Sequence, residues 1–157
     1  MLGRRHFFVH TNNLYVLCNT GKAEDINHLF FSCLFSNSCW SKLNIHWELQ
    51  PSIEERVQLA KLNFQEPWFM EIFVFAAWTI WNLRNGVIFE RKACNRRLWC
   101  NNFRCLSLLQ LCKMKEAYRQ PFCSWLDFVS PSPPPSVCSS SLAGFVLGLG
   151  KSCKLSK

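Results

Sequence analysis

The stretch that decides the fold is residues 67–84, which read PWFMEIFVFAAWTIWNLR. Pro67 suits the first turn of a helix, because the first backbone N–H groups of a helix have no internal partner and proline has none to lose. The residues that follow surround the helix axis with apolar side chains, and such a helix is usually buried. The pattern predicts a central helix that is capped or kinked at Asn85-Gly86. It also assigns three large side chains to the core in preference to a base-stacking platform: Trp78, Trp81 and Phe89.

Sequence signals before this stretch predict shorter helices. Ser52 and Glu55 form a capping box, in which each side chain accepts a hydrogen bond from the backbone N–H of the other residue. Apolar residues then recur at helical spacing over residues 53–64. Two short helices are expected at residues 24–33 and about 37–43, because apolar or cysteine side chains recur there every three to four residues.

The chain after residue 90 predicts one more long helix and then a tail. Apolar residues recur at helical spacing over residues 98–118, and the pattern breaks down after Pro121. Residues 130–136, SPSPPPS, cannot form a regular helix, because each proline removes a backbone donor and fixes φ. We expect residues 129–157 to be a Pro/Ser-rich disordered tail. The expected fold class is therefore mainly α, with a small N-terminal zinc-knuckle-like hairpin, short and long helices, and this tail.

The composition excludes one large class of enzymes. The 157 residues carry a net charge of +8 and are 49% hydrophobic, which fits one globular domain with a tail. Aspartate occurs only at Asp25 and Asp127, far apart in the sequence. A two-metal polymerase or nuclease site needs clustered carboxylates to hold its cations. We therefore expect a protein that is not an enzyme.

Positive charge is concentrated in residues 91–119, which carry eight basic residues and a single acidic one, Glu116. Basic side chains gathered in this way can neutralise several phosphates and give salt-dependent binding without sequence readout. A solvated basic helix face has the same composition, so both interpretations stay open. The partner that such a stretch suits is RNA or single-stranded DNA. The candidate phosphate contacts are Arg91, Lys92, Arg96, Arg97 and Arg104.

The cysteines bear on the compartment of the protein. Ten cysteines occur, and the N-terminal residues show no secretory signal. Because the cytosol and nucleus keep thiols reduced, we expect free thiols or metal ligands rather than disulfides. The longest apolar run, residues 72–81, is about half of the ~20 residues that a membrane-spanning helix needs. We expect an intracellular protein, nuclear or cytoplasmic, that is neither secreted nor membrane-bound. The later cysteines are interpreted as core or helix-surface thiols: Cys94, Cys100, Cys105 and Cys112.

Cys18, His28 and Cys33 form a Cys-x9-His-x4-Cys array. Zinc takes four thiolate or imidazole ligands in a tetrahedron, usually two from a tight turn and two from a short helix. His28 and Cys33 suit the helical half, whereas Cys18 suits the turn half. The Cys-x2-Cys partner of Cys18 would be residue 15, which is Tyr15. The array predicts either a zinc site completed by water or Cys39, or a metal-free knuckle held by apolar packing.

The motifs around this array resemble the zinc-binding domain of plant LINE-type (non-LTR) retrotransposon reverse transcriptases. In that family a CVLC turn precedes ED-x-x-HLF-x-x-C, and a second signature reads W-x-I-W-x-x-RN-x-x-IF. The resemblance covers roughly residues 2–128, and the combined spacings are specific where one motif alone is not. The matching motifs here are YVLC (15–18), EDINHLFFSC (24–33), WTIWNLRN followed by IF (78–89) and the closing CSWL (123–126).

The resemblance implies a domain at residues 1–128, with a knuckle at 14–40 and a helical part at 52–128. In the family this domain lies downstream of the polymerase domain and binds nucleic acid or helps to position template. The implied zinc ligands are Cys18, His28 and Cys33, and Tyr15 departs from the family pattern.

Two functional hypotheses follow from the sequence. The first is a non-catalytic, zinc-binding-type module that binds nucleic acid and is a fragment of a reverse transcriptase-like polyprotein. The alternative is a structural or interaction remnant that has neither a metal nor a nucleic-acid ligand. Such a remnant would pack an apolar helix surface against the missing polymerase domain.

Overall fold

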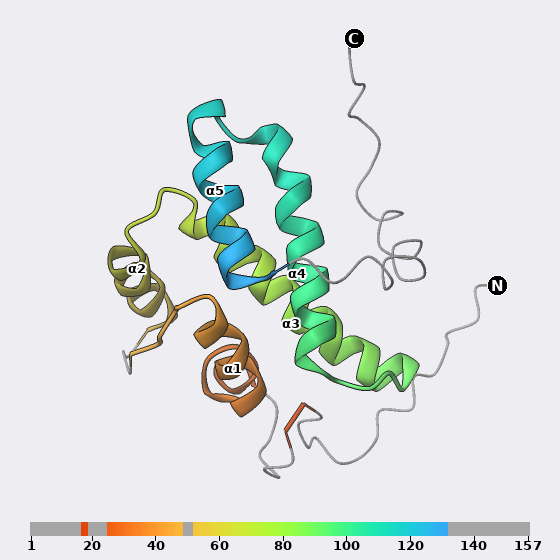
Figure 1. Ribbon diagram of the computed structural model, residues 1–157. Coiled ribbons are helices and arrows are strands. Elements are labelled where there is room, and N and C mark those ends of the chain that lie inside the picture. The colour runs from red at the N-terminus through yellow and green to blue at the C-terminus, as the bar shows by residue number, and fades with distance from the viewer. Residues whose placement is uncertain (1–16, 19–24, 49–51, 132–157) are drawn as a thin grey trace, which may run out of the picture.

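The computed structural model describes residues 17–18, 25–48 and 52–131. Within these residues the chain is mainly helical and contains no strand, which confirms the mainly α fold class. The predicted hairpin, apart from Leu17 and Cys18, and the predicted tail beyond Pro131 lie outside the described residues. The helices in chain order are the π-helical turn η1 (His28–Ser32), α1 (Leu34–Lys42), α2 (Ile53–Phe64), α3 (Phe69–Glu90), α4 (Arg96–Gln110), the 3-10 turn η2 (Leu111–Lys113) and α5 (Glu116–Val129) (Figure 1).

The centre of the fold is the crossing of α3 and α4 (Figure 1). Ala76 and Ile80 of α3 are fully buried in the same core cluster as Trp99 and Phe103 of α4. The small side chain of Ala76 allows a close approach, and the Trp99 Nε1–H donates a hydrogen bond to the Ala76 carbonyl at 3.4 Å. The prediction that residues 67–84 contribute the central helix is therefore confirmed.

One face of α3 is nevertheless open to solvent. Trp78 is 48% exposed, Trp81 41% and Phe89 61%, so the assignment of these three side chains to the core is wrong. The physical reason is that η1, α1, α2 and α4 contact α3 without surrounding a helix of 22 residues. By length and composition α3 could also cross a membrane, a property that the core helices of soluble proteins share.

The C-terminal end of α3 lies further along the chain than the sequence predicts. The sequence predicts a cap or a kink at Asn85-Gly86, and because the helix continues through this dipeptide the cap is wrong. Gly86 is buried, and the Lys92 Cδ lies 3.4 Å from the point where a Cβ of residue 86 would sit. The Lys92 side chain packs beside Gly86, and the Lys92 N–H donates to the Gly86 carbonyl at 3.1 Å. Arg91, with φ 53° in the left-handed region, ends the helix.

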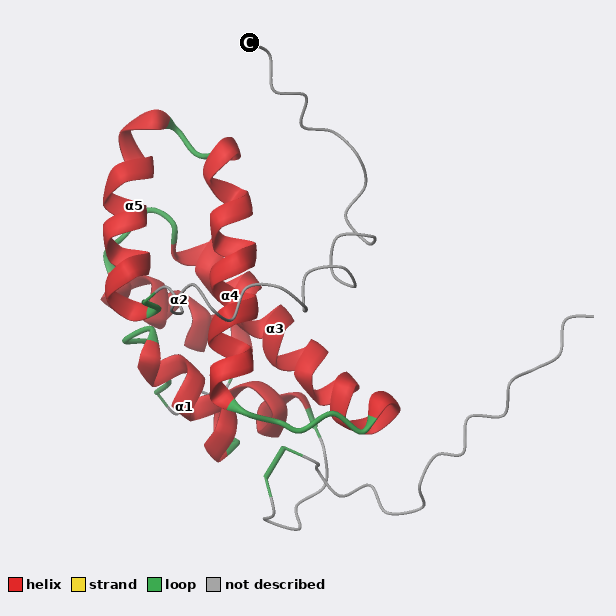
Figure 2. Ribbon diagram, turned by 45° about the vertical axis from the view of Figure 1, so that its right-hand side comes forward, coloured by secondary structure: helices red, strands yellow, loops and turns green. Residues whose placement is uncertain are grey.

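α4 and α5 form an antiparallel hairpin rather than one long helix followed by a tail (Figure 2). The predicted break after Pro121 is wrong, because Pro121 lies inside α5. The backbone hydrogen bond that proline removes would go to the carbonyl of Ala117, an exposed residue where water can take its place. Three buried side chains hold α5 on the core: Phe122, Leu126 and Val129.

α2 begins where the sequence predicts. The Glu55 N–H donates to the Ser52 Oγ at 3.1 Å, which is the N-cap half of the capping box. The helix ends at Phe64, and Gln65 follows in the left-handed region with φ 61°. The predicted helical stripe over residues 53–64 is confirmed as α2.

Candidate metal centre

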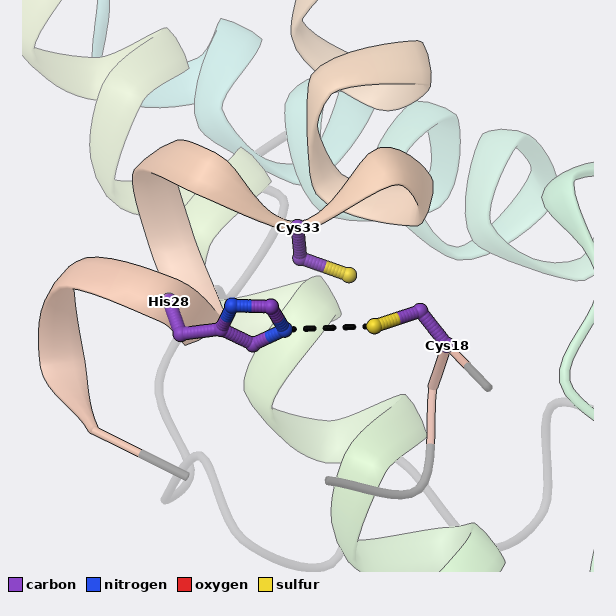
Figure 3. A group of neighbouring side chains, drawn as sticks. All are labelled: Cys18, His28 and Cys33. Carbon is purple, nitrogen blue, oxygen red and sulfur yellow. Dashed lines mark hydrogen bonds between the residues drawn. The ribbon is translucent and has the colours of Figure 1, made fainter. Parts of the chain in front are cut away.

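The three predicted ligands converge beside the first helical turn (Figure 3). The Cys18 and Cys33 sulfurs and a ring nitrogen of His28 lie within 4.8 Å of one another. The Cys18 Sγ lies 3.2 Å from the His28 Nε2. His28 and Cys33 are buried, whereas Cys18 is partly exposed. The site therefore lies at the edge of the core, with one side open to solvent.

The π-helical turn η1 brings His28 and Cys33 to the same side of the chain. The Cys33 N–H donates to the His28 carbonyl at 2.9 Å, a bond between residues five apart. In an α-helix, side chains five apart point about 140° away from each other, whereas the wider π turn brings them closer to alignment. Asp25 Oδ1 accepts from the His28 N–H at 2.6 Å and fixes the start of the turn. The short helix predicted at residues 24–33 is therefore largely a π turn rather than an α-helix.

Hydrogen bonds from α1 hold this turn against the core. The Ser36 Oγ donates to the Leu29 carbonyl at 2.5 Å, and the Trp40 Nε1–H donates to the Phe30 carbonyl at 2.6 Å. Trp40 is fully buried and stacks on Phe73 of α3 with ring centroids 5.8 Å apart. The position of the ligands is thus set by α1 and α3 as well as by the turn itself.

The donor set suits zinc. Zinc prefers thiolates and imidazoles, at about 2.3 Å to sulfur and about 2.0 Å to nitrogen. A tetrahedron with these bond lengths separates its ligand atoms by about 3.5–3.8 Å. Separations within 4.8 Å are therefore about one ångström from coordination, a distance that small side-chain rotations can close. The Ser32 Oγ, 3.5 Å from the His28 Nδ1, is placed to orient the ring while the Nε2 faces the sulfurs.

The fourth ligand position is open among the described residues. Tyr15, which occupies the position of the expected turn cysteine, lies outside the described residues. Cys39 is fully buried in α1 and does not belong to the converging group. Burial, and then the nearby Cys100 thiol, raise the pKa of Cys39 well above its ordinary value, so this thiol stays protonated. Of the two completions that the sequence leaves open, the position and burial of Cys39 speak against completion by Cys39.

Another thiol, Cys94, lies in the loop between α3 and α4 and interacts electrostatically with Cys33. Burial, and then Cys33, raise the pKa of Cys94 to about 11. The sequence places Cys94 among core or helix-surface thiols, and its packing against the core agrees with that. The sequence near Cys94 does not predict its proximity to Cys33, because the two residues are brought together by the packing of α1 beside α4.

Four of the five predicted phosphate contacts gather at the connection between α3 and α4. Lys92 forms an ion pair with Glu90, and both side chains are largely exposed. Arg96 and Arg97 occupy the first turn of α4, which holds no acidic residue. Positive charge at a helix N-terminus opposes the helix dipole, so these two arginines do not stabilise α4. All four predicted contacts are exposed: Arg91, Lys92, Arg96 and Arg97.

Arg104 lies apart from these four and joins α4 to the end of α5. Its guanidinium donates to the Asp127 carboxylate at 2.5 Å and to the Ser130 carbonyl at 2.5 Å. Its side chain is only 13% exposed. Asp127 follows 23 residues later in the chain, so the sequence carries no local signal for this ion pair. The geometry favours a structural role for Arg104 over phosphate contact.

Comparison of the chain with family models, with curated proteins and with solved structures returns no match. The resemblance to reverse transcriptase zinc-binding domains therefore rests on the motifs of the sequence. What the described residues establish is a helical fold with a Cys/His group that can hold a metal ion.

Proposed function

We propose that this protein is a non-catalytic, zinc-binding module that binds single-stranded nucleic acid. The observation that carries the proposal is the convergence of Cys18, His28 and Cys33, whose ligand atoms lie within 4.8 Å of one another. The motifs that resemble reverse transcriptase zinc-binding domains predict the same three ligands. A bound zinc ion would fasten the bend at Cys18 to the η1–α1 unit and so act as a structural clip.

A structural ion fits this site better than a catalytic one. A catalytic zinc site with three protein ligands and water also needs a general base or acid. Asp25 is the carboxylate nearest to His28 in the sequence, and its Oδ1 already accepts the His28 N–H at 2.6 Å. His28 itself belongs to the ligand group. These roles support a module that binds without catalysing a reaction.

The exposed basic residues at the α3–α4 connection support nucleic-acid binding. Arg96 and Arg97 stand at the end of α4 where positive charge lowers helix stability, by about 0.3–1 kcal/mol for each charge. Because these two arginines do not stabilise their own helix, their positions support a role in binding a ligand. Arg91 and Lys92 extend the same basic group into the preceding connection. Cations of this kind neutralise backbone phosphates whatever the base sequence.

The nucleic-acid half of the proposal is tested by fluorescence anisotropy with a labelled single-stranded RNA or DNA. Neutralising about four phosphates predicts an affinity that falls about 50-fold between 50 and 200 mM salt. We expect Arg96→Glu combined with Arg97→Glu to remove most of the binding. The matched control is Lys113→Glu with Lys115→Glu, which makes the same change of charge in the exposed connection between α4 and α5. An affinity indifferent to salt and to the arginine changes would refute this half.

A second candidate function is an interaction module without a nucleic-acid ligand. The observation that favours it is the exposed apolar face of α3, where Trp78 and Trp81 stand about half open to solvent. A module of this kind would keep its fold but would show no salt-dependent RNA or DNA affinity. The anisotropy experiment therefore separates the two candidates.

A further inference from the structure

α3 carries a long apolar face that the rest of the described chain leaves open. We call it the α3 stripe. Its members are between 36% and 61% exposed, although each is large and apolar. Large apolar side chains gathered on one face mark an interaction site more often than chance exposure does. The stripe consists of Met70, Val74, Trp78, Trp81, Ile88 and Phe89.

The members of the α3 stripe share one side of the helix. At 100° per residue they fall within a sector of about 100°, and they extend over roughly 29 Å of helix. Within that sector Asn85 is the polar residue near the middle, and Glu71 lies at the edge. Trp78 and Trp81 lie at the centre, with ring centroids 5.2 Å apart. The stripe is therefore continuous, with its two indoles in the middle.

Four of the six members of the stripe are related by symmetry about the point between Thr79 and Ile80. Reversing the helix about that point exchanges Met70 with Phe89 and Trp78 with Trp81, whereas Val74 exchanges with Asn85 and Ile88 with Glu71. A two-fold interface pairs residues in this way. If a first residue of one copy contacts a second residue of the other copy, that second residue of the first copy contacts the first residue of the other. We propose that the α3 stripe is the interface of a homodimer, in which the α3 helices of two copies pack antiparallel.

The size of the stripe agrees with a specific dimer of moderate affinity. With about 200 Å² for each large side chain, the stripe exposes roughly 550 Å² in one chain and roughly 1,100 Å² in a pair. Specific interfaces begin at about 1,200 Å² of total buried surface, and side chains at the rim would add to the stripe. The indoles of Trp78 and Trp81 from both copies would meet at the centre, where aromatic residues contribute most to binding. Dimerisation of this kind needs neither zinc nor nucleic acid, so it stands or falls independently of the proposed function.

Sedimentation equilibrium of the full chain between about 1 and 100 μM tests the proposal. We expect a reversible monomer–dimer equilibrium, which Trp78→Glu shifts to monomer by at least tenfold in the association constant. The matched control is Phe128→Glu, because Phe128 is an 84% exposed apolar residue on α5, outside the stripe. Phe128→Glu should leave the equilibrium unchanged. Far-UV circular dichroism of both variants confirms that each one folds.

A charge-pair experiment tests the antiparallel arrangement. Met70→Glu alone and Phe89→Lys alone should each weaken association, because each one places an unpaired charge opposite an apolar side chain of the other copy. Met70→Glu combined with Phe89→Lys should restore it, since the antiparallel arrangement brings these two positions together across the interface. Failure of the combined variant to recover would overturn the antiparallel packing.

Three further results would overturn the dimer itself. The first is a chain that stays monomeric at 100 μM, and the second is a dimer that Trp78→Glu leaves intact. The third is a monomer that floats with phosphatidylcholine vesicles in a way that depends on Trp78, which would assign the stripe to a lipid surface instead. Each of these results leaves the zinc and nucleic-acid measurements unaffected.

Discussion

Arg104 is the charged residue whose surroundings are most fully defined. It is nearly buried and donates hydrogen bonds to the Asp127 carboxylate and the Ser130 carbonyl at the end of α5. Replacing it leaves these acceptors without their donor. We expect Arg104→Ala to lower the free energy of unfolding by about 2 kcal/mol, measured by urea denaturation. Arg97→Ala, at an exposed position where positive charge opposes the helix dipole, should instead raise it slightly, by at most about 1 kcal/mol. Equal effects of the two changes would contradict a structural role for Arg104.

Cys94 gives a residue-scale prediction about pH. Burial, and then Cys33, raise the pKa of Cys94 to about 11, whereas an unfolded cysteine ionises near ~8.5. Between these values the unfolded state loses its proton first, so the stability of the metal-free protein falls as the pH rises from about 9 to 11. Cys94→Ser should make this fall shallower in urea denaturation at several pH values. The control is Cys112→Ser, at an exposed thiol. A pH dependence that survives Cys94→Ser unchanged would contradict the assignment.

At the scale of elements, Trp40 connects the candidate metal centre to the core. Its indole N–H holds the Phe30 carbonyl of η1, and its ring stacks on Phe73 of α3. Trp40→Phe keeps most of the apolar area but loses the hydrogen bond to the partly buried Phe30 carbonyl. We expect a loss of about 1–3 kcal/mol in thermal or urea unfolding, together with weaker zinc binding. Trp81→Phe on the open face of α3 serves as the control and should cost less than about 0.5 kcal/mol. A Trp40→Phe protein as stable as the parent would show that α1 does not anchor η1.

Pro121 gives a second prediction for an element. It lies inside α5 and removes the hydrogen bond to the Ala117 carbonyl. Pro121→Ala restores this bond, so we expect the free energy of unfolding to rise by about 1–2 kcal/mol, less than the full cost of an interior proline because the unfolded chain also gains freedom. Gln120→Ala, at the exposed neighbouring position, should have little effect. A destabilised Pro121→Ala protein would mean that α5 depends on a bend at this proline.

An element can be predicted from the sequence when the interactions that fix it join residues close together in the chain. The start of α2 was predictable, because Ser52 and Glu55 are three residues apart and their hydrogen bond is local. The His28–Cys33 spacing predicted that these ligands face one site, but the π turn depends on how α1 holds η1 against α3. α5 was missed because Pro121 outweighed the apolar spacing of Phe122, Leu126 and Val129.

The exposure of α3 shows a limit of periodicity. Its sequence is apolar on every side, so no pattern within residues 67–84 separates the covered side from the open one. That distinction depends on how many other helices are present to pack against it. The sequence therefore predicts Trp78 and Trp81 to be buried, whereas both are about half exposed.

At the scale of the whole molecule, three features lie on different elements. The ligand trio lies on the η1–α1 segment and the bend at Cys18, the basic group lies at the α3–α4 connection, and the apolar stripe lies along α3. A substitution in one of these features therefore replaces no residue of the other two. The candidate site was predictable from the sequence to the level of its three ligands, whereas Arg104 could be separated from the basic group only through the fold.

The central claim is that Cys18, His28 and Cys33 hold zinc. Native mass spectrometry of the full chain, reconstituted with one equivalent of zinc, measures it most directly. The account predicts one zinc per chain in the parent and in Cys112→Ser, and none in Cys33→Ser or His28→Ala. Tyr15→Cys should bind more tightly than the parent, because it supplies a fourth ligand, the third thiolate of the set. A parent chain that holds no zinc, or a Cys33→Ser variant that holds as much zinc as the parent, would contradict the claim.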